Sequence, residues 1–197
     1  MKYCLFAALA LGAAATAVAG TATFGWEGSE TILGSYGDVL AEVSTDQAYS
    51  GTQSLYIEEQ ASSGTSQAYV GWIVGLTDGD EVTASFMCYD DTPSGSPRGR
   101  IWAHWNDDPN DINGYSGSAG GNSTYSSGIG WEELAYTWTV DEGHTGIVIE
   151  ARIYSDPGDW VYIDDLEITA PDGATIYTPQ QQDLDSETWG AIKGSAL

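Results

Sequence analysis

Apolar and polar side chains alternate along most of this chain, in short runs separated by Gly, Asp, Ser and Pro. A period of two places every second side chain on one face of a β-strand, whereas a helix repeats every ~3.6 residues. Short alternating runs with turn residues between them predict an all-β fold, a sandwich of two antiparallel sheets. We expect strands at 21–27, 40–44, 53–59, 67–74, 80–89, 98–105, 132–140, 146–154 and 159–169.

The chain of 197 residues divides into three parts. An early positive charge, an apolar run at 4–18 and small residues after it predict a secretory signal peptide over 1–19. That run is shorter than the ~20 apolar residues that a spanning helix needs. We expect the sandwich at 20–171 and a linker with a short tail at 172–197. The predicted product is secreted, or held at the cell surface, with no membrane insertion after cleavage.

The acidic balance excludes several classes of function. Lys and Arg number 5 against 29 Asp and Glu, which gives a formal net charge of -24. Nucleic-acid binding needs cations that displace counterions from phosphates, and an anionic membrane surface repels an acidic chain. A disordered acidic tail is excluded too, because 8 Trp and 12 Tyr supply the apolar mass that such tails lack. We therefore expect a soluble acidic domain with a packed core.

Aromatic and cationic side chains gather at the polar positions of three expected strands. Rings of Trp and Tyr stack on the apolar C–H faces of pyranoses, while Arg and Glu form planar hydrogen bonds with hydroxyls. If the three strands are neighbours, they predict a carbohydrate-binding face, and a cluster of surface salt bridges is the alternative. The residues of this predicted face are Tyr89, Arg100, Trp102, His104, Glu150, Arg152 and Tyr154.

The connection at 106–130 is long and rich in Gly, Ser and Asn. Loops of this length are usually functional or disordered. Tyr115 and Tyr125 lie within it and Trp131 follows it, and a disordered spacer would rarely contain such residues. We expect an ordered loop whose rings form a wall of the binding face. Trp72 lies in a strand that is apolar at both parities, so it belongs either to the core or to the rim.

Three segments carry a resemblance to a known family. They are Phe-Gly-Trp-Glu-Gly at 24–28, Tyr-Ser-Gly-Thr-Gln-Ser-Leu at 49–55 and Trp-Val-Tyr-Ile-Asp-Asp-Leu-Glu-Ile at 160–168. In this order the chain resembles, over 21–170, the carbohydrate-binding modules with a galactose-binding-like jelly roll, the group of families four, nine and twenty-two. The resemblance implies two packed antiparallel sheets, no catalysis, a glycan groove and often a structural calcium ion between the first and last strands.

A calcium site can also be argued from the residues. Asp164 has the parity of Leu166 and Ile168, so it points inward if they are core residues. A buried carboxylate is costly without a partner, and calcium, which takes roughly six to eight oxygens, would provide one. Glu27 matches the acidic position of the family's first-strand motif and is the expected second ligand, with Asp165 as the alternate. The other interpretation is that Asp164 accepts backbone N–H bonds at a strand end.

Catalytic signatures are weak. His104 and His144 are the only histidines, and nothing marks a nucleophile elbow. Glycosidases need two carboxylates across a cleft, whereas adjacent acidic residues in a strand point to opposite faces. We therefore predict a secreted, non-catalytic carbohydrate-binding module for a neutral polysaccharide. The alternatives are a structural or adhesive cell-surface sandwich that binds proteins, and a small polysaccharide lyase or hydrolase in which Glu150, near His104 or Tyr154, acts as an acid.

Overall fold

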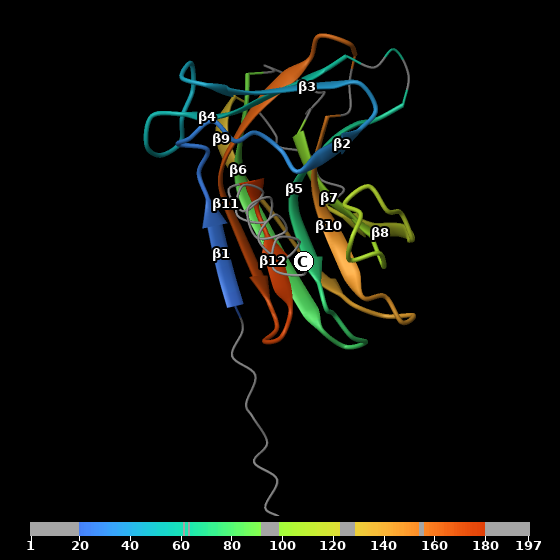
Figure 1. Cartoon of the computed structure of the whole chain (residues 1–197). Helices are drawn as coiled ribbons and strands as arrows, with labels where there is room; N and C mark the ends of the chain where they lie inside the picture. The colour runs from blue at the N-terminus through green and yellow to red at the C-terminus, as the bar shows by residue number, and fades with distance from the viewer. Residues whose placement is uncertain are drawn as a thin grey trace, which may run out of the picture.

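Two antiparallel sheets packed face to face make up the protein (Figure 1). The computed structural model describes residues 20–60, 62, 64–91, 99–122, 129–153 and 156–179. Sheet A has the strand order β3-β4-β11-β6-β9, with β1 beside β11, and sheet B has the order β12-β5-β10-β7-β8, with β2 beside β5. The strands of sheet A are β1 (Gly20–Phe24), β3 (Val39–Ser44), β4 (Ser54–Glu59), β6 (Glu81–Asp90), β9 (Gly130–Thr139) and β11 (Trp160–Ala170). The strands of sheet B are β2 (Gly34–Tyr36), β5 (Ser66–Val74), β7 (Gly99–Trp105), β8 (Gly117–Gly121), β10 (Gly146–Ile153) and β12 (Thr175–Tyr177).

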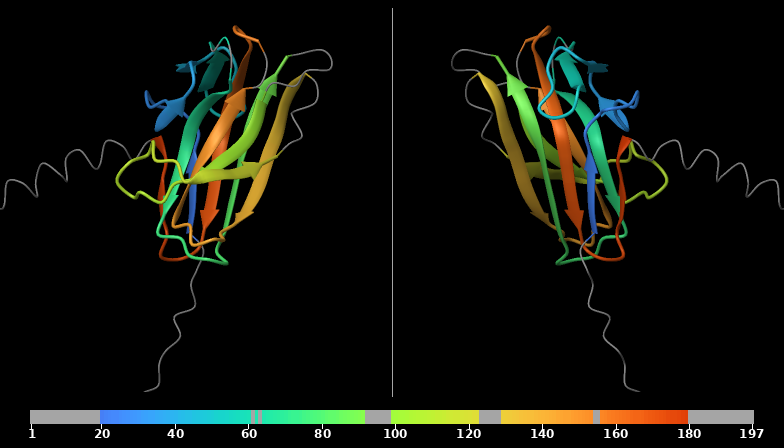
Figure 2. Two further views of the ribbon diagram at one scale, coloured as in Figure 1. Left: turned by 90° about the vertical axis from the view of Figure 1, so that its right-hand side faces the viewer. Right: turned by 90° about the vertical axis from the view of Figure 1, so that its left-hand side faces the viewer.

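The expected all-β sandwich is confirmed, and every strand predicted from the alternation is present. The sequence did not predict β2, β8 and β12, because β2 and β12 have three residues each and β8 is mostly glycine, so they contain too few side chains to show a period of two. Figure 1 shows the two sheets side by side, and Figure 2 turns first the sheet B side and then the sheet A side toward the viewer. Within the described ranges, no helix has the length and apolar character needed to cross a bilayer. The predicted signal peptide at 1–19 and the tail from 180 onward lie outside these ranges.

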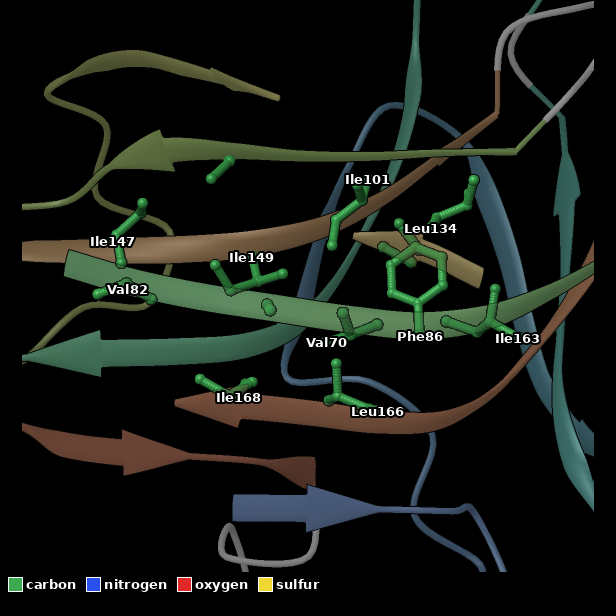
Figure 3. Packing of buried hydrophobic residues seen from close by; sticks show 14 of the residues in the cluster. Val70, Val82, Phe86, Ile101, Leu134, Ile147, Ile149, Ile163, Leu166 and Ile168 are labelled. Atoms are coloured by element: carbon green, nitrogen blue, oxygen red, sulfur yellow. The ribbon is translucent and has the colours of Figure 1, made fainter. Parts of the chain in front are cut away.

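The core lies between the inner faces of the two sheets (Figure 3). In β6 the alternation places Val82, Ala84, Phe86 and Cys88 in it, each at most 1% exposed. Full burial of an aliphatic or Phe side chain is worth about 1.5–3 kcal/mol. A Cβ at Gly99 of β7 would lie 2.4 Å from the Cys88 sulfur, so glycine lets the sheets approach closely there. Cys88 is therefore a small buried hydrophobe.

One expectation about strand neighbours is wrong. β7 and β10 are paired in sheet B, but β6 belongs to sheet A. Outer faces of a sandwich point in opposite directions, so Tyr89 of β6 cannot share a face with Arg100 or Trp102 of β7. The alternation within a strand shows which side chains face the core, but it does not show which of the two sheets contains the strand.

Candidate functional site

The outer face of sheet B brings together five residues of the predicted binding face, Arg100, Trp102, His104, Glu150 and Arg152. Antiparallel pairing places Glu150 of β10 between Tyr69 of β5 and Trp102 of β7. Two residues further along, Arg152 is opposite Arg100. Directly opposed side chains in an antiparallel pair lie about 5 Å apart. The prediction that the strands of Trp102 and Glu150 are neighbours is therefore confirmed by the pairing of β7 with β10.

Glu150 is the centre of a buried hydrogen-bonded group. One carboxylate oxygen lies 2.5 Å from Nδ1 of His104, and the other accepts a hydrogen bond from Nε of Arg152. Glu150 is completely buried, and His104 is 2% exposed beneath the 106–116 segment, with Nε2 lying 3.2 Å from the carbonyl of Gly114. We expected both side chains to bond sugar hydroxyls on the surface. Their burial instead gives them a positioning role, because they orient Arg152 and hold the segment above them.

Trp102 is the half-buried aromatic residue at the middle of this face. The guanidinium carbons of Arg100 and Arg152 lie 5.1 and 5.0 Å from its ring centroid, within the range of cation–π attraction. Its Nε1 donates to Oγ of Ser118 in β8 at 3.1 Å, which fixes the rotation of the indole. The indole ring and the two guanidinium groups are therefore packed against one another on the outer face of sheet B.

A cavity of about 560 Å³ opens beside this surface. That size lies within the range of small-molecule sites. Tyr115, 70% exposed, forms one wall as predicted for the 106–130 connection, and its ring lies 5.6 Å from His104. The cavity is lined by Tyr36, Gln67, Tyr69, Asn113, Tyr115, Ser118 and Arg152.

Sequence reasoning missed most of this lining. Gln67 and Tyr69 alternate with the core residue Ala68, so strand parity could have placed them outside. Tyr36 lies in β2, which has no alternation to reveal it. Asn113 is on the segment between β7 and β8, whose path over the sheet is set by tertiary contacts.

Tyr69 is the most buried aromatic residue of the cavity, at 5% exposed. Burial, and then the charge of Glu150, raise the pKa of the Tyr69 phenol to about 12, although Arg152 opposes this. The hydroxyl therefore stays protonated at physiological pH. It can donate a hydrogen bond to a ligand in the cavity.

Trp72 lies on the same outer face but outside the cavity. It packs on a small cluster of Leu33, Tyr69 and Val148, and its ring is 5.1 Å from that of Tyr177. Its Nε1 is buried with no hydrogen-bond partner among the described residues. The sequence leaves Trp72 either in the core or at the rim of the binding face, and the structure places it at the rim.

The other predicted ring residues do not join this face. Tyr89 and Trp131 are directly opposite each other in β6 and β9, on the outer face of sheet A. The expectation that Trp131 walls the cleft is wrong, because the chain crosses to the other sheet before β9 begins. Tyr125 and Tyr154 lie outside the described residues.

The predicted metal ligands surround the segment at 49–53. Asp164 pairs with Met87 on the outer face of sheet A, so the expectation that it shares the inward parity of Leu166 is wrong. The cause is an irregularity in β11 at Asp165, whose φ of 47° reverses the alternation. Asp164 is nevertheless fully buried, because the 49–53 segment lies over it. Its Oδ2 accepts the N–H groups of Tyr49 and Ser50 at 2.9 and 3.1 Å.

Glu27 is held by the same segment. Its carboxylate accepts the N–H groups of Thr52 and Gln53 at 2.8 and 3.1 Å and the Thr52 hydroxyl at 2.9 Å. These bonds hold the pKa of Glu27 below its usual value. In contrast, burial raises the pKa of Asp164, with the charge of Asp165 adding to this.

The described residues contain no group of three or more His, Cys, Asp or Glu side chains arranged for a metal ion. A hard cation would offset the repulsion between Asp164 and Asp165, although the Asp164 oxygens, like those of Glu27, already accept three hydrogen bonds. Backbone carbonyls would have to supply the remaining oxygens. Calcium at this position therefore stays a prediction.

No protein-family model and no curated protein matches the chain. Solved structures do. The C-terminal family 22 carbohydrate-binding module of Clostridium thermocellum Xyn10B matches at 17% identity and a TM-score of 0.52, over 77% of this chain and 92% of that one. The CBM22-1–CBM22-2 tandem of Paenibacillus barcinonensis Xyn10C matches at 15% identity and a TM-score of 0.58, over 82% and 48%. The chain thus has the jelly-roll sandwich fold of these modules, as its three segments predicted.

Proposed function

We propose that the protein is a secreted, non-catalytic carbohydrate-binding protein whose ligand, a neutral polysaccharide, binds on the outer face of sheet B. The observation that carries this proposal is the cavity of about 560 Å³ beside Trp102 and Arg152. Its walls combine rings with hydrogen-bonding side chains, which is the combination that a pyranose requires. The fold shared with family 22 modules supports the same function.

The donors of this site favour a neutral glycan. Arg152 and the protonated Tyr69 phenol donate to hydroxyl and ring oxygens, and Asn113 can both donate and accept. The net charge of -24 repels an acidic glycan, and only the positive charges of Arg100 and Arg152 would attract one at this face. We therefore propose a xylan or a neutral β-glucan as the ligand.

Burial of the Glu150–His104 pair argues against a lyase or hydrolase. A general acid must reach the atom that it protonates. Glu150 has no exposed surface, and both of its oxygens already have partners in His104 and Arg152. The pair therefore supports the site instead of reacting in it.

Affinity electrophoresis and calorimetry test the proposal. Wild type should bind xylan or β-glucan in preference to polygalacturonate, and Trp102→Ala should weaken that binding roughly tenfold. Tyr136→Ala is the matched control, since Tyr136 is an exposed ring of sheet A outside the proposed site. Equal affinity of Trp102→Ala and wild type would overturn the assignment of this face.

A further inference from the structure

A row of four aromatic side chains crosses the outer face of sheet A, opposite to the proposed site. Tyr56 is directly opposite Tyr162, Tyr162 opposite Tyr89, and Tyr89 opposite Trp131, so β4, β11, β6 and β9 contribute one ring each. Successive ring centroids lie 5.2, 6.1 and 5.5 Å apart. We call these four residues the aromatic row.

Two further rings extend the row. Trp160 lies 5.4 Å from Tyr162, and Tyr49, which is 51% exposed, lies 5.7 Å from Trp131. Tyr162 is buried by its neighbours, whereas the other three rings of the row are partly exposed. Adjacent strands are about 4.8 Å apart, so the row spans about 14 Å, the length of a short oligosaccharide.

The position of Tyr49 is fixed by the fold. Its backbone N–H donates to the buried carboxylate of Asp164, which sits on the same outer face one row below Tyr162. A hydrogen bond to a buried carboxylate is stronger than one between neutral groups. The end of the row is thus preorganised, which lowers the entropy cost of binding.

Hydrogen-bond acceptors border the row. The Tyr56 hydroxyl donates to Glu58 at 2.6 Å, and Glu42 is opposite Tyr56 on the neighbouring strand. Asp46 lies close enough that its charge, after burial, raises the pKa of Tyr162. None of the six strands of sheet A contains Lys or Arg, so the two described arginines both belong to sheet B.

This chemistry selects among possible occupants. Carboxylates without cations repel nucleic acid, acidic glycans and a second copy of this acidic chain. An apolar protein surface would bury the charges of Glu42 and Glu58 without offering a cation or further donors, at a cost. Sugar hydroxyls, in contrast, donate to carboxylates while the C–H faces of the rings stack on aromatic side chains.

We propose that the aromatic row is a second carbohydrate-binding surface, which takes a neutral glycan laid across the strands of sheet A. The site goes beyond the proposed function, since it uses other residues on the opposite face. Two sites on opposite faces of one domain can bind two glycan chains at once. The protein would then cross-link a polysaccharide, with an avidity that exceeds the affinity of either site.

The test uses the protein without its signal peptide and soluble xylan and β-glucan as probes. In a Trp102→Ala background, Trp131→Ala should weaken the residual binding roughly tenfold. Tyr136→Ala, on the same strand β9 but outside the row, should leave it unchanged. Thermal melts and circular dichroism of each variant establish that the sandwich is intact. Tyr89→Phe keeps the aromatic ring and should therefore retain most of the binding.

The outcomes separate the two sites. Loss of all binding in Trp102→Ala alone would overturn the aromatic row while leaving sheet B supported. Loss in Trp131→Ala with none in Trp102→Ala would support the row and overturn the sheet B site. Sedimentation that shows a dimer in wild type and a monomer in Trp131→Ala would also overturn the proposal, because the row would then be a protein interface.

Discussion

The buried carboxylate of Glu150 accepts a hydrogen bond from Nε of Arg152 and thereby holds its guanidinium 5.0 Å from the Trp102 ring centroid. Glu150 has no exposed surface and Arg152 is 11% exposed. Buried ion pairs contribute little net stability, but the removal of one partner leaves an uncompensated charge. The pair therefore gives the candidate site its geometry.

Glu150→Gln should lower both stability and glycan affinity. The amide keeps the shape but removes the charge that pairs with Arg152 and His104, so we expect a loss of about 3 kcal/mol in the free energy of unfolding. Denaturant unfolding measures this loss, and calorimetry with xylan measures the affinity. Glu133→Gln, at an exposed position of β9, is the matched control. If both variants unfold at the same denaturant concentration as wild type, the central role of Glu150 is wrong.

The sequence predicted the sandwich and its core but only part of the site. Alternation reveals which side chains of β6, β7 and β10 face inward, because burial of apolar surface requires it. It does not reveal that β6 pairs with β11 and not with β7, since pairing is decided by contacts between distant segments. The prediction that Tyr89 shares a face with Trp102 is therefore wrong, and alternation alone does not reveal the aromatic row.

Strand parity also does not show which outward side chains are buried by other parts of the chain. Glu150 and His104 have the outward parity expected of them, yet His104 is buried beneath the chain at 106–116, and Glu150 is buried against His104 and Arg152. Alternation through β11 predicts an inward Asp164, but the positive φ of Asp165 interrupts the alternation between Asp164 and Leu166. A period of two does not reveal an irregularity of this kind, because non-glycine residues rarely adopt the left-handed conformation.

Tyr69→Phe isolates one hydrogen bond of the proposed cavity. The ring stays buried, and among the described residues the hydroxyl has no hydrogen-bond partner to lose, so the melting temperature should change little. A ligand that accepts from the phenol should bind several-fold more weakly. Because the pKa of Tyr69 is about 12, wild-type affinity should stay constant from neutral pH to mildly alkaline pH. A wild-type affinity that falls in that interval would contradict the donor role of Tyr69.

Glu27 should stabilise the protein at neutral pH and lose this effect in acid. Hydrogen bonds from Thr52 and Gln53 lower its folded pKa below the unfolded value of 4.5. The stabilisation is therefore fully present above 4.5 and disappears as the pH falls through the folded pKa. Melting temperatures of wild type and Glu27→Gln should differ at neutral pH and converge in acid. A difference that does not depend on pH would show that shape, and not charge, anchors this segment.

Removal of calcium should destabilise the protein if Asp164 and Asp165 bind the ion as proposed. The raised pKa of Asp164 shows that its charge is unfavourable in the folded state, and a cation that binds only this state would offset the cost. We expect a chelator to lower the melting temperature by several degrees and added calcium to restore it. Asp165→Asn should melt at the same temperature with and without chelator, and loss of the chelator response in Glu27→Gln would identify Glu27 as a second ligand. A wild-type melt that the chelator leaves unchanged would exclude a structural calcium ion and leave the N–H groups of the 49–53 segment as the stabilising partners of Asp164.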